Sequence, residues 1–328
     1  MTQKESIQNL TDCLLQKTGE VRATGLYDGK AGLSLSLFIA SGYLQDERAE
    51  DRAYSLLQES LVVTGSNLSF ETGLSGIGYA LLCLLENDCI EADFDDIFGR
   101  QYKALIHSLE TIEKDPERLL QSLQTIYFLA KARSVKPDDS DRIQAIIKKI
   151  FEGVELFLTL QFHDFTDIHY ISKKANVLQI YRTYLKLVDY AGYAHFSRFL
   201  LDNYATLYRR GRIAGSLETG FFLNRLTGRY KVGGYEDIIG DHISYGIKNV
   251  YPVTLSMREG IDLAKVMDNM QREATPKDAA LSNLIHHRLE SVILYLQKTK
   301  EQDFTVSGYG AGLARLLIFY VNRDIELL

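Results

Sequence analysis

The sequence predicts an all-α protein whose helices form one α/α toroid, with seven inner helices wrapped by seven outer helices. Three observations support this prediction. Glycine-rich turns open apolar runs near both ends of the chain, two kinds of helical segment alternate, and the starts of one kind recur at a nearly constant spacing. Self-similarity at a fixed period is the signature of a repeat architecture. We therefore expect a single domain over residues 1–328, built from seven helix pairs.

The three glycine-rich turns have similar sequences. They read Gly29-Lys-Ala-Gly32-Leu-Ser-Leu, Gly73-Leu-Ser-Gly76-Ile-Gly-Tyr and Tyr309-Gly-Ala-Gly312-Leu-Ala-Arg. A glycine without a Cβ permits a tight turn into a helix and a close approach of the backbone to a neighbour or a ligand. The first N–H groups of a helix have no partner within it and carry the positive end of its dipole. We therefore expect these turns to present the functional residues, because repeats display their loops there.

Seven segments, which we call outer-type helices, are long, amphipathic and charged on one side. Their apolar residues recur three and four positions apart, which marks one buried stripe. They cover Glu5–Lys17, Asp46–Val63, Phe94–Glu113, Asp139–Leu160, Ala191–Arg210, Tyr235–Lys248 and Lys277–Lys298.

Seven further segments, which we call inner-type helices, are shorter and less charged. A helix that is apolar all round must be buried all round, so we assign these segments to the inner ring. They start near Gly29, Gly73, Gln121, Tyr170, Gly220, Gly260 and Tyr309. Successive starts differ by 44, 48, 49, 50, 40 and 49 residues, which is the period of the predicted repeat. The sequence Thr-Gly-Arg-Tyr-Lys-Val-Gly-Gly within residues 226–235 predicts a loop or a short hairpin there.

The composition argues against several classes of function. With 46% hydrophobic residues and a net charge of −6, the chain is typical of a soluble globular protein without a nucleic-acid footprint. No apolar stretch reaches the roughly 18 residues of a membrane helix, and the polar first residues do not resemble a signal peptide. The three cysteines include no CxxC pair, so we expect free thiols, a cytoplasmic protein, and neither nucleic acid nor membrane as a partner.

Polar and charged residues stand directly ahead of several inner-type helices. The tripeptide Glu-Thr-Gly occurs at Glu71–Gly73 and again at Glu218–Gly220. An acid at the start of a helix can cap its free N–H groups, and a ring of such acids can also line a common site at the mouth of a toroid. The residues of this rim are Tyr27, Asp28, Glu71, Thr72, Glu117, Asp167, His169, Glu218, Thr219, Arg258, Glu259 and Ser307.

This pattern resembles the lanthionine synthetase C-like family, the cyclases of lanthionine-containing peptides. Gly25-Leu-Tyr-Asp-Gly29-Lys-Ala-Gly32 and Phe70-Glu-Thr-Gly73-Leu-Ser-Gly76 look like the repeat signature of that family. The resemblance implies a toroid of seven repeats whose inner helices begin with Gly-x-x-Gly turns. The architecture covers nearly the whole chain, whereas the specific likeness is confined to repeats one, two and seven.

The chemistry of the family depends on a zinc ion that lowers the pKa of a substrate thiol. The resemblance places its ligands at a Cys ahead of the fifth turn and a Cys-His-Gly at the sixth. Here those places read Leu217-Glu218-Thr219-Gly220 and Arg258-Glu259-Gly260, and no cysteine follows Cys89. An arginine in the first coordination shell would repel a dication. We therefore expect no zinc, no other cofactor and no zinc-dependent cyclase activity.

Two further positions follow from the resemblance. The family has a histidine directly before the turn of repeat four, thought to handle protons, and His169 falls there by the period. Glu117 loosely matches an acid that partners this histidine. Contact of His163 and His169 with a metal in a loop is a further possibility. His286 and His287 look like metal ligands, but adjacent helical positions diverge by about 100°, so we expect them to be exposed or packed.

Three functions remain open from the sequence. The first is a zinc-free lanthionine synthetase C-like protein that binds a peptide or protein in its central cavity, as an accessory or a diverged enzyme of peptide modification. Its candidate catalytic groups are His169, Glu218 and Glu259. Its candidate ligand-binding residues are Tyr27, Asp28, Glu71, Glu117 and Arg258.

The alternative to peptide binding is a glycosidase or sugar epimerase on a related α/α toroid. Glu218 and Glu259 would then serve as its acid and base. The complete absence of tryptophan argues against this alternative, because sugar sites commonly use that ring as a platform. The third possibility is a scaffold without chemistry, a solenoid whose concave face binds a partner.

Overall fold

The computed structural model describes residues 2–62, 67–111, 116–167, 169, 171–270, 276–299 and 312–321. These residues contain fifteen α-helices, two short 3-10 helices and no strand, so the predicted all-α class is confirmed. No helix in these ranges is both long enough and apolar enough to cross a membrane. The chain divides into two compact units, Met1–Leu105 with Tyr251–Leu328 (unit 1) and Ile106–Val250 (unit 2).

Unit 1 alternates between the two kinds of helix that the sequence predicts. The outer-type helices are α1 (Gln3–Lys17), α3 (Glu47–Leu61), α5 (Phe94–Thr111), whose last residues belong to unit 2, and α14 (Pro276–Thr299). The inner-type helices are α2 (Lys30–Leu44), α4 (Leu74–Glu86), α13 (Met257–Met270) and α15 (Leu313–Val321). A 3-10 helix, η2 (Pro252–Thr254), precedes α13.

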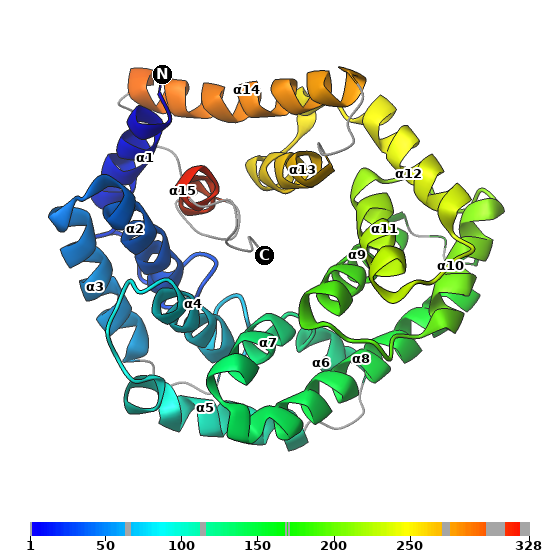
Figure 1. Ribbon diagram of the computed structural model, residues 1–328, viewed down its shortest axis with the longest axis horizontal. Coiled ribbons are helices and arrows are strands. Elements are labelled where there is room, and N and C mark those ends of the chain that lie inside the picture. The colour runs from blue at the N-terminus through cyan, green and yellow to red at the C-terminus, as the bar shows by residue number, and fades with distance from the viewer. Residues whose placement is uncertain are drawn as a thin grey trace. The chain divides into compact units, whose positions relative to one another are not determined.

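Helix α2 lies at the centre of the packing in unit 1. It contacts α3, α4 and α15, and every residue from Ala31 to Ser41 is buried. Helix α1 packs against α14 and α15, and α13 packs against the same two helices (Figure 1). The Gln3 side-chain amide of α1 donates to the Tyr320 carbonyl oxygen of α15 at 2.6 Å. The first helix of the chain therefore lies beside the last two described helices.

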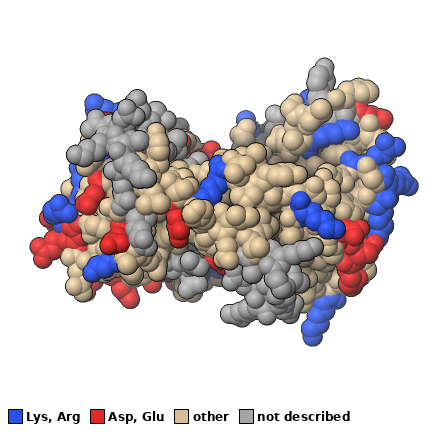
Figure 2. Space-filling view, turned by 90° about the horizontal axis from the view of Figure 1, so that it is seen from above, with Lys and Arg blue, Asp and Glu red and all other residues tan. Residues whose placement is uncertain are grey.

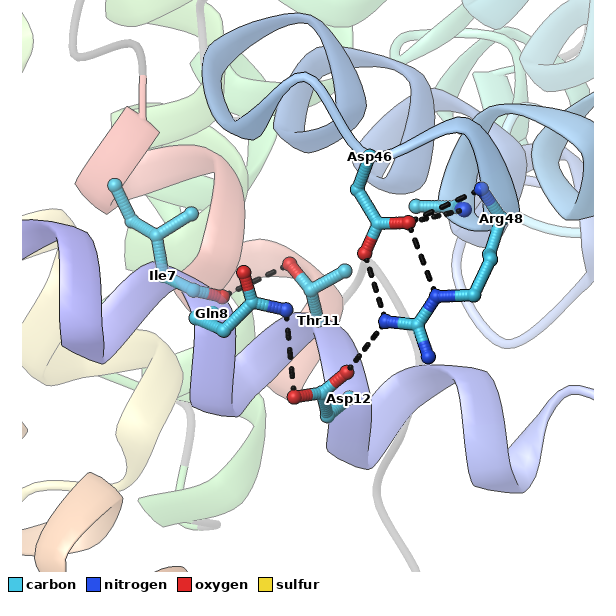
Figure 3. Close-up of polar contacts among 7 residues, drawn as sticks. Ile7, Gln8, Thr11, Asp12, Asp46 and Arg48 are labelled. Carbon is cyan, nitrogen blue, oxygen red and sulfur yellow. Dashed lines mark hydrogen bonds and ion pairs between the residues drawn. The ribbon is translucent and has the colours of Figure 1, made fainter.

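A small polar network joins the start of α3 to α1 (Figure 3). Asp46 is the N-cap of α3, and its carboxylate accepts from the backbone N–H groups of Arg48 (3.0 Å) and Ala49 (3.4 Å). The Arg48 guanidinium returns to Asp46 at 3.0 Å and reaches Asp12 of α1 at 3.5 Å. Its hydrogen bond lowers the pKa of Asp46, so the cap stays ionised at neutral pH.

Unit 2 is built from two layers of helices. The outer-type layer is α8 (Ser140–His163), α10 (Arg198–Arg209) and α12 (Glu236–Asn249). The inner-type layer is α7 (Thr125–Val135), α9 (Ile171–Ala191) and α11 (Leu217–Tyr230). Within each layer successive helices are in contact, and α7, α9 and α11 also pack against α8 or α12 (Figure 1). Two short elements, α6 (Pro116–Gln121) and η1 (Pro137–Asp139), precede α7 and α8.

Aromatic side chains fill the space between α8, α9 and α10. The Tyr181 ring stacks on the Tyr204 ring with centroids 4.3 Å apart, and it meets Phe162 edge-on at 5.3 Å. Tyr184 packs against Phe151 at 5.7 Å. All five side chains are buried, so this aromatic cluster forms the core of unit 2.

Three expectations about individual elements need correction. The loop predicted over residues 226–235 is confined to residues 231–235, because α11 continues through Tyr230 and ends at Lys231, whose left-handed backbone (φ 52°) closes the helix. Repeat three does not enter its inner-type helix at Gln121, which instead ends the short helix α6. Helix α9 is neither short nor weakly charged: its 21 residues include five charged side chains.

Lys and Arg side chains and Asp and Glu side chains are interspersed on the face that Figure 2 shows. Neither sign of charge covers that face by itself.

Candidate functional site

The first two glycine-rich turns pack directly against each other in unit 1. The Tyr27 backbone N–H donates to the Glu71 carbonyl oxygen at 2.9 Å. A Cβ on Gly25 would lie 2.8 Å from that same oxygen, and a Cβ on Gly76 would overlap the Phe70 carbonyl group. Gly25 is therefore needed because the neighbouring turn lies too close for a side chain, and Gly76 is needed because Phe70 of its own turn and Leu26 of the neighbouring turn both do.

The first N–H groups of α2 and α4 are used by the loops ahead of them. Lys30 donates to the Ala23 carbonyl at 2.9 Å, and Ala31 donates to the Thr24 carbonyl at 3.2 Å. In the same way, Leu74 donates to the Asn67 carbonyl at 2.9 Å. These three N–H groups are therefore hydrogen-bonded within the protein.

Four side chains of unit 1 form a polar cluster that includes two predicted ligand-binding residues, and we call it the Tyr27 cluster. The Arg258 guanidinium lies 5.3 Å from the centroid of the Tyr27 ring, and its Nε lies 3.9 Å from Asp262 Oδ2. Asp262 also accepts from Nη2 of Arg315, which is fully buried in α15. The cluster thus joins the loop before α2 to α13 and α15.

Burial keeps the hydroxyl of Tyr27 protonated. Desolvation raises the pKa of Tyr27, although the positive charges of Arg258 and Arg315 oppose this effect. The hydroxyl can therefore donate a hydrogen bond at neutral pH. Two acids of the predicted rim, Asp28 and Glu71, lie on the same pair of turns and have exposed side chains.

Glu259 serves as a helix cap in the structure. Its carboxylate accepts from the backbone N–H of Ser256 at 2.8 Å and from the Ser256 hydroxyl at 2.7 Å. In return, the Glu259 N–H donates to the Ser256 hydroxyl oxygen at 3.3 Å. This reciprocal pair is a capping box at the start of α13. Glu259 and Arg258 therefore belong to the first turn of α13 and do not precede it.

Glu218 also lies within a first helical turn, in unit 2. Helix α11 begins at Leu217, and Ser216 is its N-cap. The Glu218 carboxylate pairs with the Arg182 guanidinium of α9 at 3.1 Å. Because Glu218 and Glu259 fall in different units and each has a protein partner, their predicted pairing as acid and base gains no support.

His242 of α12 forms a buried network that the sequence reasoning missed. The Ser216 N–H donates to its Nδ1 at 2.9 Å, so the ring proton must lie on Nε2, which donates to the Tyr204 hydroxyl at 3.1 Å. Burial lowers the pKa of His242 to about 4, so the ring is neutral at pH 7. Gly220 leaves room for it, because a Cβ there would lie 2.8 Å from the His242 Cβ. The network therefore ties the start of α11 to α10 and α12.

The predicted proton-handling residue, His169, is exposed just ahead of α9. Its predicted partner Glu117 is in α6, but the side chain of Glu117 lies outside the described residues, as does Ser307. His163 is also exposed, and its Nδ1 lies 2.9 Å from Asp164 Oδ1. The structure therefore presents His169 to solvent and does not test its pairing with Glu117.

The histidine pair of α14 has the packed and exposed positions that the sequence predicts. His286 Nε2 lies 3.0 Å from Asp268 Oδ1, and the His286 ring stacks on Phe319 at 5.8 Å. His287 is exposed. Across the described residues, no group of three His, Cys, Asp or Glu side chains is placed to hold a metal ion.

The remaining site residues that the sequence reasoning missed are Asp262, Arg315 and Arg182. A signal for Arg315 was available, since it is the one charge in the apolar run Leu313–Val321. A lone charge in a buried helix needs a partner, and Asp262 supplies it from another helix. The identity of that partner could not be read from the spacing of residues.

Comparisons with protein-family models, with curated proteins and with solved structures gave no match to this chain.

Proposed function

We propose that this chain binds a peptide or protein as a zinc-free relative of the lanthionine synthetase C-like proteins, acting in peptide modification. The proposal rests on the residues that stand at the two turns where that family would place its metal ligands, and on the partners that these residues contact. Glu218 pairs with Arg182, Glu259 caps α13 through Ser256, and Arg258 lies over the Tyr27 ring. None of the three supplies the thiolate or imidazole that a catalytic zinc ion prefers.

The proposal includes the closed α/α toroid of seven helix pairs in one domain. Its support is the alternation of outer-type and inner-type helices through both units, together with the packing of α1 against α14 and α15. Small-angle scattering tests it, because a closed ring and an open solenoid of this length differ in maximum dimension. An elongated shape would overturn the toroid and favour the scaffold that the sequence left open.

The Tyr27 cluster is the part of unit 1 that we assign to the ligand. The Tyr27 hydroxyl is a donor, and the Arg258 side chain is 37% exposed, so its guanidinium can reach a carbonyl or carboxylate group. Asp28 and Glu71 would face amine groups beside it. In unit 2, the exposed His169 is the candidate catalytic imidazole of this proposal. The glycosidase alternative has no supporting observation.

Two measurements test the proposal. Elemental mass spectrometry of protein purified without added metal is expected to find almost no zinc, whereas near-stoichiometric zinc would restore the cyclase and make His163, His169 and His286 the ligands to test. Calorimetry with peptides encoded beside its gene is expected to show binding that Arg258→Gln weakens. Arg209→Gln, at an exposed ion pair of α10, is the matched control. Failure to bind any peptide would overturn the proposed function.

A further inference from the structure

The inner-type helices of unit 2 carry a concentrated positive charge. Together α7, α9 and α11 contain eight Lys or Arg residues against two acids, a net charge of +6, whereas the whole chain carries −6. The outer-type helices α8, α10 and α12 contain six basic and seven acidic residues. The charged residues of the inner-type layer are Lys131, Arg133, Lys173, Lys174, Arg182, Lys186, Asp189, Glu218, Arg225 and Arg229.

The adjacent helices α9 and α11 carry six of these cations, and we call four of them the basic face: Arg182 and Lys186 of α9, and Arg225 and Arg229 of α11. In each helix the two residues are four positions apart and share one side. Contacts between the helices align them, because Arg182 meets Glu218 at the start of α11. Near the other end, Asp189 meets Arg225 at 2.7 Å and Arg229 at 3.2 Å. The two helices therefore run parallel, with these side chains along their junction.

The four cations of the basic face outnumber Glu218 and Asp189, the two acids on α9 and α11 that pair with them. Asp189 is 8% exposed and holds two guanidinium groups, so its single charge neutralises only one of them. The Arg225 and Arg229 side chains are 49% and 48% exposed. The Lys186 ammonium lies over the Tyr127 ring at 5.8 Å. Four cations against two anions leave a net charge of +2 at this face.

The face lies on the side of α9 that is turned away from α8. Tyr181 and Tyr184 pack against Phe162 and Phe151 of α8. Tyr184 lies two positions from both Arg182 and Lys186, and two positions correspond to about 200° around a helix. Along α11 the stripe from Glu218 to Arg229 is about 16 Å long at 1.5 Å per residue, which matches about five extended residues.

We propose that the basic face binds an acidic peptide segment in extended conformation, whose carboxylates pair with Arg225, Arg229 and Lys186. This inference rests on the proposed function and names the class of peptide. Guanidinium groups form bidentate pairs with carboxylates, and Asp189 holds two of them in place for such pairing. Phe221 lies 5.8 Å from the Arg225 guanidinium and Tyr230 lies 5.7 Å from that of Arg229, so rings flank both cations.

Fluorescence anisotropy tests this proposal with a labelled decapeptide that contains five glutamates and a matched decapeptide that contains five lysines. The full chain is expected to bind the glutamate peptide, to bind it more weakly as salt rises, and to bind the lysine peptide far less. The double variant Lys186→Gln/Arg225→Gln should weaken binding of the glutamate peptide by about tenfold. Arg229 remains in this variant to pair with Asp189, and thermal unfolding monitors its fold.

The matched control removes the same charge from outer-type helices. Lys148 of α8 and Lys248 of α12 are exposed, and Lys148→Gln/Lys248→Gln should change the affinity by less than about twofold. If the double variant unfolds, the affinity of Lys186→Glu for the glutamate peptide is compared with that of the control instead.

The outcomes separate this inference from the function it rests on. The basic face would be wrong as the binding site if the two decapeptides bound equally well. It would also be wrong if the control variant lost as much affinity for the glutamate peptide as the double variant. In either case peptides from the gene neighbourhood could still bind elsewhere, and the proposed function would stand. Tighter binding of single-stranded DNA than of the glutamate peptide would overturn the choice of partner. If no peptide of any kind bound, both the inference and the proposed function would fail.

Discussion

The inner-type helices of the two units occupy equivalent positions in the repeat and have different surfaces. In unit 1, α2, α4 and α15 carry one charged residue each, whereas α13 carries five, and α4 is buried continuously from Leu74 to Leu84. In unit 2, helix α9 by itself carries five charged residues, and it is buried on only one side. Helix position in a repeat therefore does not set the chemistry of the helix.

This contrast shows two ways of placing polar groups on a helical repeat. Unit 1 collects them at helix ends, where the loop before α2 meets α13 and α15 in the Tyr27 cluster. Unit 2 places them along the helices, where Arg182 and Asp189 of α9 bind partners on α11. A helix buried on every side can contribute function only at its ends, whereas an amphipathic one has a whole side for a ligand.

The largest effect is expected from breaking the buried ion pair of unit 1. Asp262→Asn removes a carboxylate charge that pairs with the fully buried Arg315, and loss of one partner from a buried guanidinium should cost about 3 kcal/mol of unfolding free energy. Urea denaturation followed by circular dichroism measures the loss. The control is Asp237→Asn in unit 2, where the pair with Arg209 is exposed and should contribute under about 1 kcal/mol. Equal losses would mean that burial does not distinguish the two pairs.

The packing of neighbouring glycine turns gives the next largest effect. In Gly76→Ala the new Cβ would overlap the Phe70 carbonyl and lie 2.8 Å from the Leu26 Cβ, so we expect a loss of about 2 to 3 kcal/mol. Gly99→Ala in α5 is the control, because its Cβ would meet only Asp95 side-chain atoms at 3.4 Å or more. This change should raise the free energy of unfolding by about 0.5 kcal/mol. A neutral Gly76→Ala, again measured by urea denaturation, would contradict the close approach of the turns.

Acid is expected to weaken unit 2 through His242. Its folded pKa of about 4 lies below its usual 6.5, so the unfolded chain takes up the proton first as pH falls. The stabilisation is therefore complete above about pH 6.5 and is lost toward pH 4, by about 3 kcal/mol. Hydrogen exchange should show this loss in peptides of α10, α11 and α12.

His242→Gln isolates that effect, because an amide can accept from Ser216 and donate to Tyr204 without titrating. The variant should lose less protection between pH 6.5 and pH 4 than the wild type, and exposed His195→Gln should behave like the wild type. Burial raises the pKa of Glu155, which acts in the opposite direction but is common to all three proteins. An identical pH profile in His242→Gln would contradict the neutral, hydrogen-bonded imidazole.

The sequence by itself determined the helical class and the order of the helices. Apolar spacing identified every outer-type helix, and Gly29 and Gly73 are the N-caps of α2 and α4. These features could be predicted because they depend on periodicity and on residues close together in the chain. The loop predicted over residues 226–235 began too early, because Thr-Gly-Arg is typical of a turn, whereas these residues lie in α11 together with the buried Leu226.

Only the tertiary structure decided what the polar residues do. Glu259 finds its partner three residues away and caps a helix, whereas Glu218 pairs with Arg182 from the preceding inner-type helix. Asp262 pairs with Arg315, which lies 53 positions away in the sequence, and Ser216 hydrogen-bonds to His242, which lies 26 positions away. A sequence pattern reports which residues share a helix face, but the partner of a polar group depends on which faces meet. That choice is made by the packing of distant helices.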